Sequence, residues 1–89
     1  MDLETLFRSS EADLQEALAD RAEVRVNVTA DARLHVRRGE ERGYEADLLV
    51  EDRVVGRVTA DDLARFRQQL KEQIATHVSR DQQPDLTRL

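Results

Sequence analysis

The residues best suited to catalysis lie near the end of a predicted helix. His77 is followed by Ser79 and Asp81, the side-chain types that hydrolases combine as base, nucleophile and orienting acid. Helical spacing places Ser79 on a different side of the helix from His77, and no glycine-rich oxyanion loop accompanies them. A histidine in a last helical turn also offsets the helix dipole and covers the rim of a core. We therefore predict a structural role for His77 and no catalytic residue in the chain.

The sequence contains no motif that is typical of a metal or cofactor site. The chain has no cysteine, which removes thiolate nucleophiles, disulfides and zinc–sulfur sites. His35 has no second ligand at a usable spacing, the acids lack EF-hand spacing, and the three glycines form no phosphate-binding loop. We expect no metal, no cofactor and no small-molecule substrate, and hence no enzyme.

Acidic residues gather in the first quarter of the chain. The net charge is −5, and residues 1–23 carry all of it, with seven acids against Arg8 and Arg21. On a helix, five of these acids would form an exposed ridge: Asp2, Asp13, Glu16, Asp20 and Glu23. Exposed helix faces are commonly charged, but such a ridge could also imitate nucleic acid, as viral inhibitors of host enzymes do. Because the ridge advances about 5 Å per step and a DNA strand about 3.4 Å per phosphate, mimicry is the alternative hypothesis.

A β-hairpin followed by a helix is predicted between Tyr44 and Ser79. Residues 44–50 alternate apolar and polar side chains, as in a strand with one buried face. Residues 51–53 form a polar turn, and the return strand directs three residues inward: Val54, Gly56 and Val58.

The helix after this hairpin is marked by a cap and an apolar stripe. Thr59 and Asp62 have the spacing of a capping box, which predicts that the helix begins at Thr59. Apolar residues then recur with the period of a helix that packs on a sheet: Leu63, Phe66, Leu70, Ile74 and Val78.

The first half of the chain predicts a helix and two more strands. An apolar stripe runs from Leu3 to Ala22, although Ser10 and Asp13 could cap a second helix after a short first one. Val24, Val26 and Val28 indicate a strand. Residues 30–38 are either a short helix or a second strand; we favour the strand, because it buries Leu34 and Val36 on one face.

These elements predict one α+β domain. With 89 residues, 39% of them hydrophobic and 37% charged, the chain forms a single modest core. Residues 1–79 should form a four-stranded antiparallel meander with the N- and C-terminal helices on one face, and residues 80–89 a flexible tail. The glycine-bounded loop 39–43 joins the two hairpins. No apolar run could span a membrane, and the acidic start MDLETLF is the opposite of the basic, apolar start of a signal peptide, so we expect a cytoplasmic protein.

The outward sheet face should place an acidic third strand between basic neighbours. Arg33 and Arg37 lie on the second strand, and Glu45 and Asp47 lie on the third. Cross-strand pairs of opposite charge stabilise sheets. Sheets that read nucleic acid stack bases on aromatic residues, and this face has none, so we expect no direct nucleic-acid binding.

Two apolar residues, Leu49 and Val55, point out into this charged face. Exposed apolar neighbours can form a partner contact or a dimer interface. We therefore expect a non-catalytic, regulatory protein–protein interaction module with a protein partner or a second copy. The predicted partner-binding residues lie on the sheet face and on the first helix: Leu49, Val55, Arg33, Arg37, Asp13, Glu16, Asp20 and Glu23.

Overall fold

The fold is an antiparallel sheet with helices on one side. The computed structural model describes residues 1–20, 23–39 and 43–88. Their elements, in chain order, are α1 (Leu3–Arg8), α2 (Glu11–Asp20), β1 (Val24–Asn27), β2 (Ala32–Arg38), β3 (Tyr44–Val50), β4 (Arg53–Ala60), α3 (Leu63–His77) and the 3₁₀ turn η1 (Leu86–Arg88). The strands pair antiparallel in the order β1-β2-β3-β4. The predicted α+β meander is confirmed. Three parts of the sequence predictions lie outside the described residues: residues 21 and 22 at the end of the predicted first helix, residues 40–42 in the middle of the predicted loop, and residue 89 of the predicted tail.

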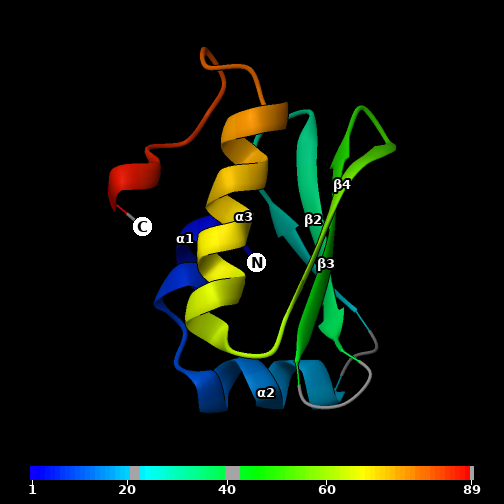
Figure 1. Ribbon diagram of the computed structural model, residues 1–89, viewed down its shortest axis with the longest axis vertical. Helices are drawn as coiled ribbons and strands as arrows, with labels where there is room; N and C mark the ends of the chain where they lie inside the picture. Colours follow the sequence, from blue (N-terminus) through cyan, green and yellow to red (C-terminus); the bar gives the residue numbers. More distant parts are fainter. Residues whose placement is uncertain (21–22, 40–42, 89) are drawn as a thin grey trace.

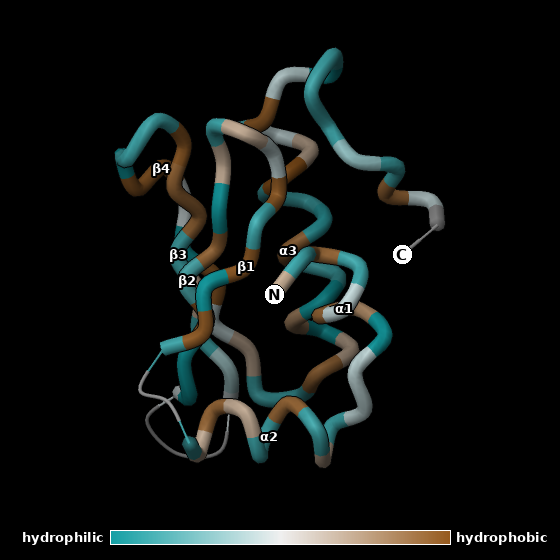
Figure 2. Tube along the Cα trace, turned by 180° about the vertical axis from the view of Figure 1, so that it is seen from behind, coloured by the Kyte–Doolittle hydropathy of each residue, from teal (hydrophilic) through white to brown (hydrophobic). Residues whose placement is uncertain are grey.

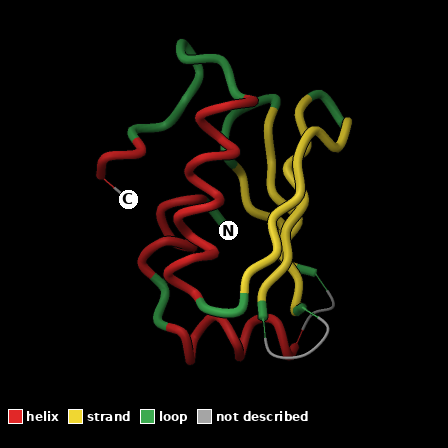
Figure 3. Tube along the Cα trace, in the orientation of Figure 1, coloured by secondary structure: helices red, strands yellow, loops and turns green. Residues whose placement is uncertain are grey.

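The helices leave one face of the sheet bare. α1 and α3 lie side by side on one face, and α2 crosses the end of the sheet where β3 begins (Figure 1, Figure 3). β1, β2 and β3 alternate buried and more exposed positions over most of their length, and β4 does so only in its second half. The bare face of the sheet is called the outer face from here on.

The core lies between the sheet and the helices. Side chains from β2 and β3 are buried against those of the helices, with Leu34, Val36 and Leu48 facing Leu6 and a row on α3: Phe66, Leu70 and Ile74. Burying one such side chain stabilises the fold by about 1.5–3 kcal/mol. The alternation predicted for the first three strands and the stripe predicted for the last helix are both confirmed.

The N-terminal segment is two helices, one of the two arrangements that the sequence left open. The amide of Thr5 donates to the Asp2 carboxylate at 2.8 Å, which caps α1 and lowers the pKa of Asp2. The amide of Asp13 donates to the Ser10 hydroxyl at 3.1 Å, as in a cap of α2. From α3, the Arg67 guanidinium donates to the carbonyls of Leu6 and Ser9 at the end of α1. It satisfies carbonyls that a broken helix would otherwise leave unpaired.

Residues 30–38 follow the favoured prediction, because β2 occupies 32–38 and buries Leu34 and Val36. The rival helix is wrong. The hydroxyl of Thr29 accepts hydrogen bonds from the amides of Asp31 and Ala32, at 3.2 and 3.0 Å, and so closes the turn before β2.

The predicted start of the last helix is wrong. Thr59 is not a cap but lies in β4 opposite Glu45, and Ala60 pairs with Tyr44. Asp62 is the cap instead: its carboxylate accepts from the amide of Arg65 at 2.8 Å. Sheet pairing therefore continues through the residues whose local pattern resembled a capping box.

The β3–β4 turn has two residues rather than the predicted three. Arg53 already pairs with Val50, which leaves Glu51 and Asp52 at the tip, with φ angles of 52° and 66°. Consecutive positive φ angles characterise the type I′ hairpin turn, which matches the twist of the strands and normally contains Asn-Gly. Glu51 adopts it against its own preference, and Asp52 occupies the position where glycine is usual.

This turn yields a stability prediction. Replacing Glu51 and Asp52 by Asn and Gly should raise the free energy of unfolding by about 1 kcal/mol, since each L residue in this region costs about 1–2 kcal/mol and the exposed Arg33–Asp52 ion pair that is lost contributes about 0–1 kcal/mol. Urea denaturation measures the change. As a matched control, Asp61→Gly acts at an exposed loop residue without positive φ and should not stabilise. Equal gains from both variants would contradict the explanation.

A β-bulge overturns the inward prediction for Val54. Leu48 pairs with Gly56 but Leu49 pairs with Val54, so Val55 is an extra residue in β4. Because cross-strand partners share a face, Val54 joins Leu49 on the outer face. Val54 is 57% exposed and Val55 37%.

The C-terminal segment folds back toward α3. The Gln83 amide donates to the carbonyls of Ala75 and Val78, at 3.1 and 2.8 Å, and Leu86 packs against the core. The predicted flexibility of residues 80–89 stays a prediction.

Candidate interaction surface on the outer sheet face

The outer face is built from rows of residues that pair across the four strands. Strand register fixes these rows, because partners on neighbouring strands place their side chains on the same side. From β1 to β4, the first row is Asn27, Arg33, Leu49 and Val54, and the second is Arg25, His35, Asp47 and Arg57; a third, on β2 to β4, is Arg37, Glu45 and Thr59.

Ion pairs occupy the middle of this face. Arg37 donates to Glu45 at 2.8 Å and to Asp47 at 3.1 Å, and Arg57 donates to Asp47 at 2.8 Å. The hydrogen bond to Glu45 is the main cause that raises the pKa of Arg37. Burial of Asp47 favours a higher pKa, but the hydrogen bonds from Arg57 and Arg37 outweigh it and hold the pKa of Asp47 below its usual value. The predicted pairing of an acidic third strand with basic neighbours is confirmed.

Two more of the predicted site residues, Arg33 and Glu23, also have partners within the molecule. Arg33 donates to Asp52 at the hairpin tip, and Nδ1 of His35 lies 2.8 Å from the carboxylate of Glu23. Nε2 of His35 is enclosed and has no hydrogen-bond partner. Arg33, Arg37 and Glu23 are thus engaged within the molecule, so a partner would have to compete for them.

The acidic ridge is shorter than a single helix would make it. Asp13, Glu16 and Asp20 are exposed on α2, but Asp2 caps α1 and Glu23 follows α2 and faces β2. The break at Ser9 and Ser10 separates Asp2 from the acids of α2. Nucleic-acid mimicry by this ridge stays a prediction.

The first row of the outer face is apolar where it crosses β3 and β4. Leu49 and Val54 are cross-strand partners and Val55 is the bulged residue beside them. These three residues are called the apolar end patch. In Figure 2 the β4 trace is brown near the hairpin, which marks its hydrophobic residues. Sequence reasoning found Leu49 and Val55 but missed Val54. The available signal was Gly56, since a glycine inside a strand is typical of a bulge.

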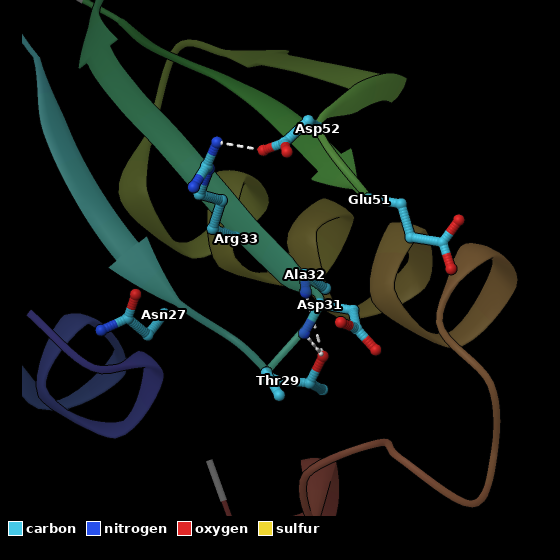
Figure 4. Close-up of a pocket in the computed structure, with 8 residues that line it drawn as sticks. Asn27, Thr29, Asp31, Ala32, Arg33, Glu51 and Asp52 are labelled. Carbon is cyan, nitrogen blue, oxygen red and sulfur yellow. Dashed lines mark hydrogen bonds and ion pairs between the residues drawn. The ribbon is translucent and has the colours of Figure 1, made fainter.

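A small hollow lies beside this patch, between the β1–β2 loop and the β3–β4 turn. It is lined by Asn27, Thr29, Asp31, Arg33, Glu51 and Asp52, among others. In Figure 4 the Arg33 side chain is directed at Asp52 and the Thr29 hydroxyl at backbone amides of its own loop. The amide of Glu51 donates to the Asp31 carbonyl at 2.9 Å and ties the two loops together. Among the described residues, no three histidine or acidic side chains are placed to hold a metal ion.

His77 lies in the last turn of α3. Its ring carbon Cδ2 lies 3.5 Å from the position that a Cβ on Gly56 would take, so it covers the rim of the core above β4. Ser79 and Asp81 follow in the exposed segment after the helix. This position agrees with the structural role predicted for His77.

Fold and surface together define a small α+β domain whose sheet has one helix-covered face and one open, ion-paired face with an apolar end. Comparison with protein-family models, with characterised proteins and with solved structures gave no match. Within the described part of the chain, no helix has the length and apolar character needed to cross a bilayer.

Proposed function

We propose that the protein is a non-catalytic interaction module that binds another protein through the apolar end patch. One observation carries this proposal: among the described residues, the large hydrophobic residues that are exposed to solvent are Met1, Val54 and Val55. Two of these three are adjacent and lie beside the half-buried Leu49. A contiguous apolar surface rimmed by charge is typical of a protein contact.

The rest of the outer face supports a contact confined to this end. Arg37 is half-buried between Glu45 and Asp47, and a partner that recruited it would have to break these pairs, which costs binding energy. The patch therefore supplies affinity, and the exposed charges of the hairpin supply orientation.

The placement of the aromatic residues supports a protein rather than a nucleic acid as the partner. The chain has three aromatic residues, Phe7, Tyr44 and Phe66, and all three are buried in the core. Bases bound by sheets stack on exposed aromatic rings. A cytoplasmic site of action belongs to the same proposal, and fractionation of the source cell tests it.

Val54→Lys tests the proposed surface. We expect a partner captured on the immobilised wild-type protein from source-cell lysate to be retained at least about tenfold less by the variant, since central apolar contacts contribute most of the binding energy. Leu49→Glu and Val55→Glu should act alike. Quantitative mass spectrometry of the retained proteins measures the effect, and circular dichroism confirms that each variant is folded.

Asn27→Lys is the matched control for this test. Asn27 is exposed, lies in the same row on the opposite edge strand, and gains the same charge. It should retain the partner as the wild type does. A partner lost equally from both variants, or from neither, would contradict binding through the apolar end patch.

A further inference from the structure

We propose, building on the function proposed above, that the partner of the apolar end patch is a second copy of this chain. In this dimer the two β4 strands lie antiparallel about a two-fold axis that passes between Val54 and Val55. The contact is isologous, so each interaction occurs twice.

The two edges of the sheet differ in a way that selects β4. On the β1 edge, the amide of Asn27 donates to the Met1 carbonyl at 2.9 Å, and Asp2 forms a parallel bridge with Asn27. The chain thus covers part of that edge with its own N-terminal residues. β4 is the other outermost strand, and within the described residues no strand pairs with its free side (Figure 1). An uncovered edge strand is a template for another chain.

Charges along the hairpin are self-complementary about the two valines. The acids Glu51 and Asp52 precede them and Arg57 follows them. With Val54 opposite Val55 of the second copy, Asp52 lies opposite Arg57 of that copy, and Arg53 lies opposite a glycine. The Arg57 side chain is 63% exposed despite its bond to Asp47, and the Asp52 side chain is 81% exposed despite its bond to Arg33. Each group therefore has room for a second partner beside the one within its own chain.

The same charges exclude other registers and favour a second copy over a different strand. A dimer centred on Arg57 would place two arginines against each other, which destabilises a sheet pairing. A uniformly acidic partner strand could pair only with Arg57, and a uniformly basic one only with Asp52. A second copy presents both charges, so Arg57 of each copy meets Asp52 of the other.

The bulge at Val55 limits the strength of this contact. A bulge leaves its extra residue unpaired and twists the strand locally, which is one way that proteins blunt an open edge. We therefore expect side chains to provide most of the contact and the dimer to be weak and transient, as small interfaces often are.

Sedimentation equilibrium over a range of protein concentrations tests the dimer. The wild type should show a monomer–dimer equilibrium, Val54→Lys should raise the dissociation constant at least about tenfold, and Asn27→Lys should leave it unchanged. A wild type that stays monomeric at millimolar concentration would overturn the proposal, and so would equal effects of the two lysines.

A charge exchange tests the register. The double variant Glu51→Lys, Asp52→Lys and the variant Arg57→Glu should each self-associate more weakly than the wild type, and their equimolar mixture should regain association as a one-to-one dimer. If both variants fold but their mixture does not associate, the proposed register is wrong. If Arg57→Glu does not fold, the comparison of Val54→Lys with Asn27→Lys tests the dimer instead. A monomeric wild type whose lysate partner is lost with Val54→Lys would remove the dimer and leave the proposed function intact.

Discussion

Replacing Tyr44 by alanine is expected to lower the free energy of unfolding by about 3–5 kcal/mol, the usual cost of removing a buried aromatic ring. Tyr44 is fully buried at the start of β3, and its ring lies 5.3 Å from that of Phe66 on α3. Its hydroxyl accepts from the Gln15 amide at 2.9 Å and donates to Glu11 at 3.4 Å, both on α2. One side chain thus joins the sheet, α3 and α2. Urea denaturation followed by circular dichroism measures the loss.

Tyr44→Phe separates the ring from the hydroxyl. It keeps the stacking on Phe66 and removes only the hydrogen bonds to α2, so it should cost about 1 kcal/mol. Amide hydrogen exchange should then increase in α2 more than in β3. If phenylalanine destabilised the protein as much as alanine, the hydroxyl rather than the packed ring would hold the elements together.

Asp47→Asn is expected to lower the free energy of unfolding by about 1.5–3 kcal/mol, the range for hydrogen bonds to charged groups. The Asp47 side chain is only 14% exposed and accepts from both Arg37 and Arg57. The asparagine keeps the shape but leaves two guanidinium groups with a neutral partner. Thermal and urea unfolding measure the difference.

An exposed ion pair provides the control for Asp47. Glu4 and Arg8 on α1 are 2.9 Å apart, with side chains 58% and 72% exposed. Glu4→Gln should change the stability by less than about 1 kcal/mol, because water already screens the pair. Similar losses at Asp47 and Glu4 would contradict the view that burial gives the central pairs their effect.

The pH dependence of stability follows from the same carboxylate. The pKa of Asp47 lies below its ordinary value of 3.8 in the folded protein, so the unfolded chain binds this proton more readily than the native state does. The stabilisation is present above the ordinary pKa and is lost as the pH falls through the folded-state pKa. Unfolding measured from pH 6 downward should therefore show a smaller acid-induced loss for Asp47→Asn than for the wild type. An unchanged pH slope would contradict this role.

The ion pairs and the apolar end patch have complementary consequences for binding. Arg33, Arg37 and Arg57 all have carboxylate partners within the molecule, so the central face offers a partner little uncompensated charge. The side chains of Val54 and Val55 at the bulge are apolar and take part in no ion pair. A contact there gains free energy from removing apolar surface from water without breaking an existing interaction.

Periodicity in the sequence was enough to predict the architecture. Valines and leucines that alternate in residues 24–28, 33–37 and 44–50, together with a helical stripe from Leu63 to Val78, permit few arrangements other than a meander covered on one side. The alternation also predicted that Leu49 faces outward and that Asp47 lies between basic strands. These features depend on the repeat of the backbone itself, which is two residues in a strand and 3.6 in a helix.

The sequence alone therefore determined most of the residues that enter the core and which strands are neighbours. Tertiary structure decided the details on which the candidate site depends: the outward position of Val54, the pairing of Glu23 with His35, and the start of α3 after Asp62 rather than at Thr59. Each of these depends on the register between segments distant in the chain. A one-residue bulge in β4 moves Val54 to the opposite face because adjacent strand positions point to opposite sides. A local sequence pattern cannot predict such a shift, because it does not show which residues pair across the sheet.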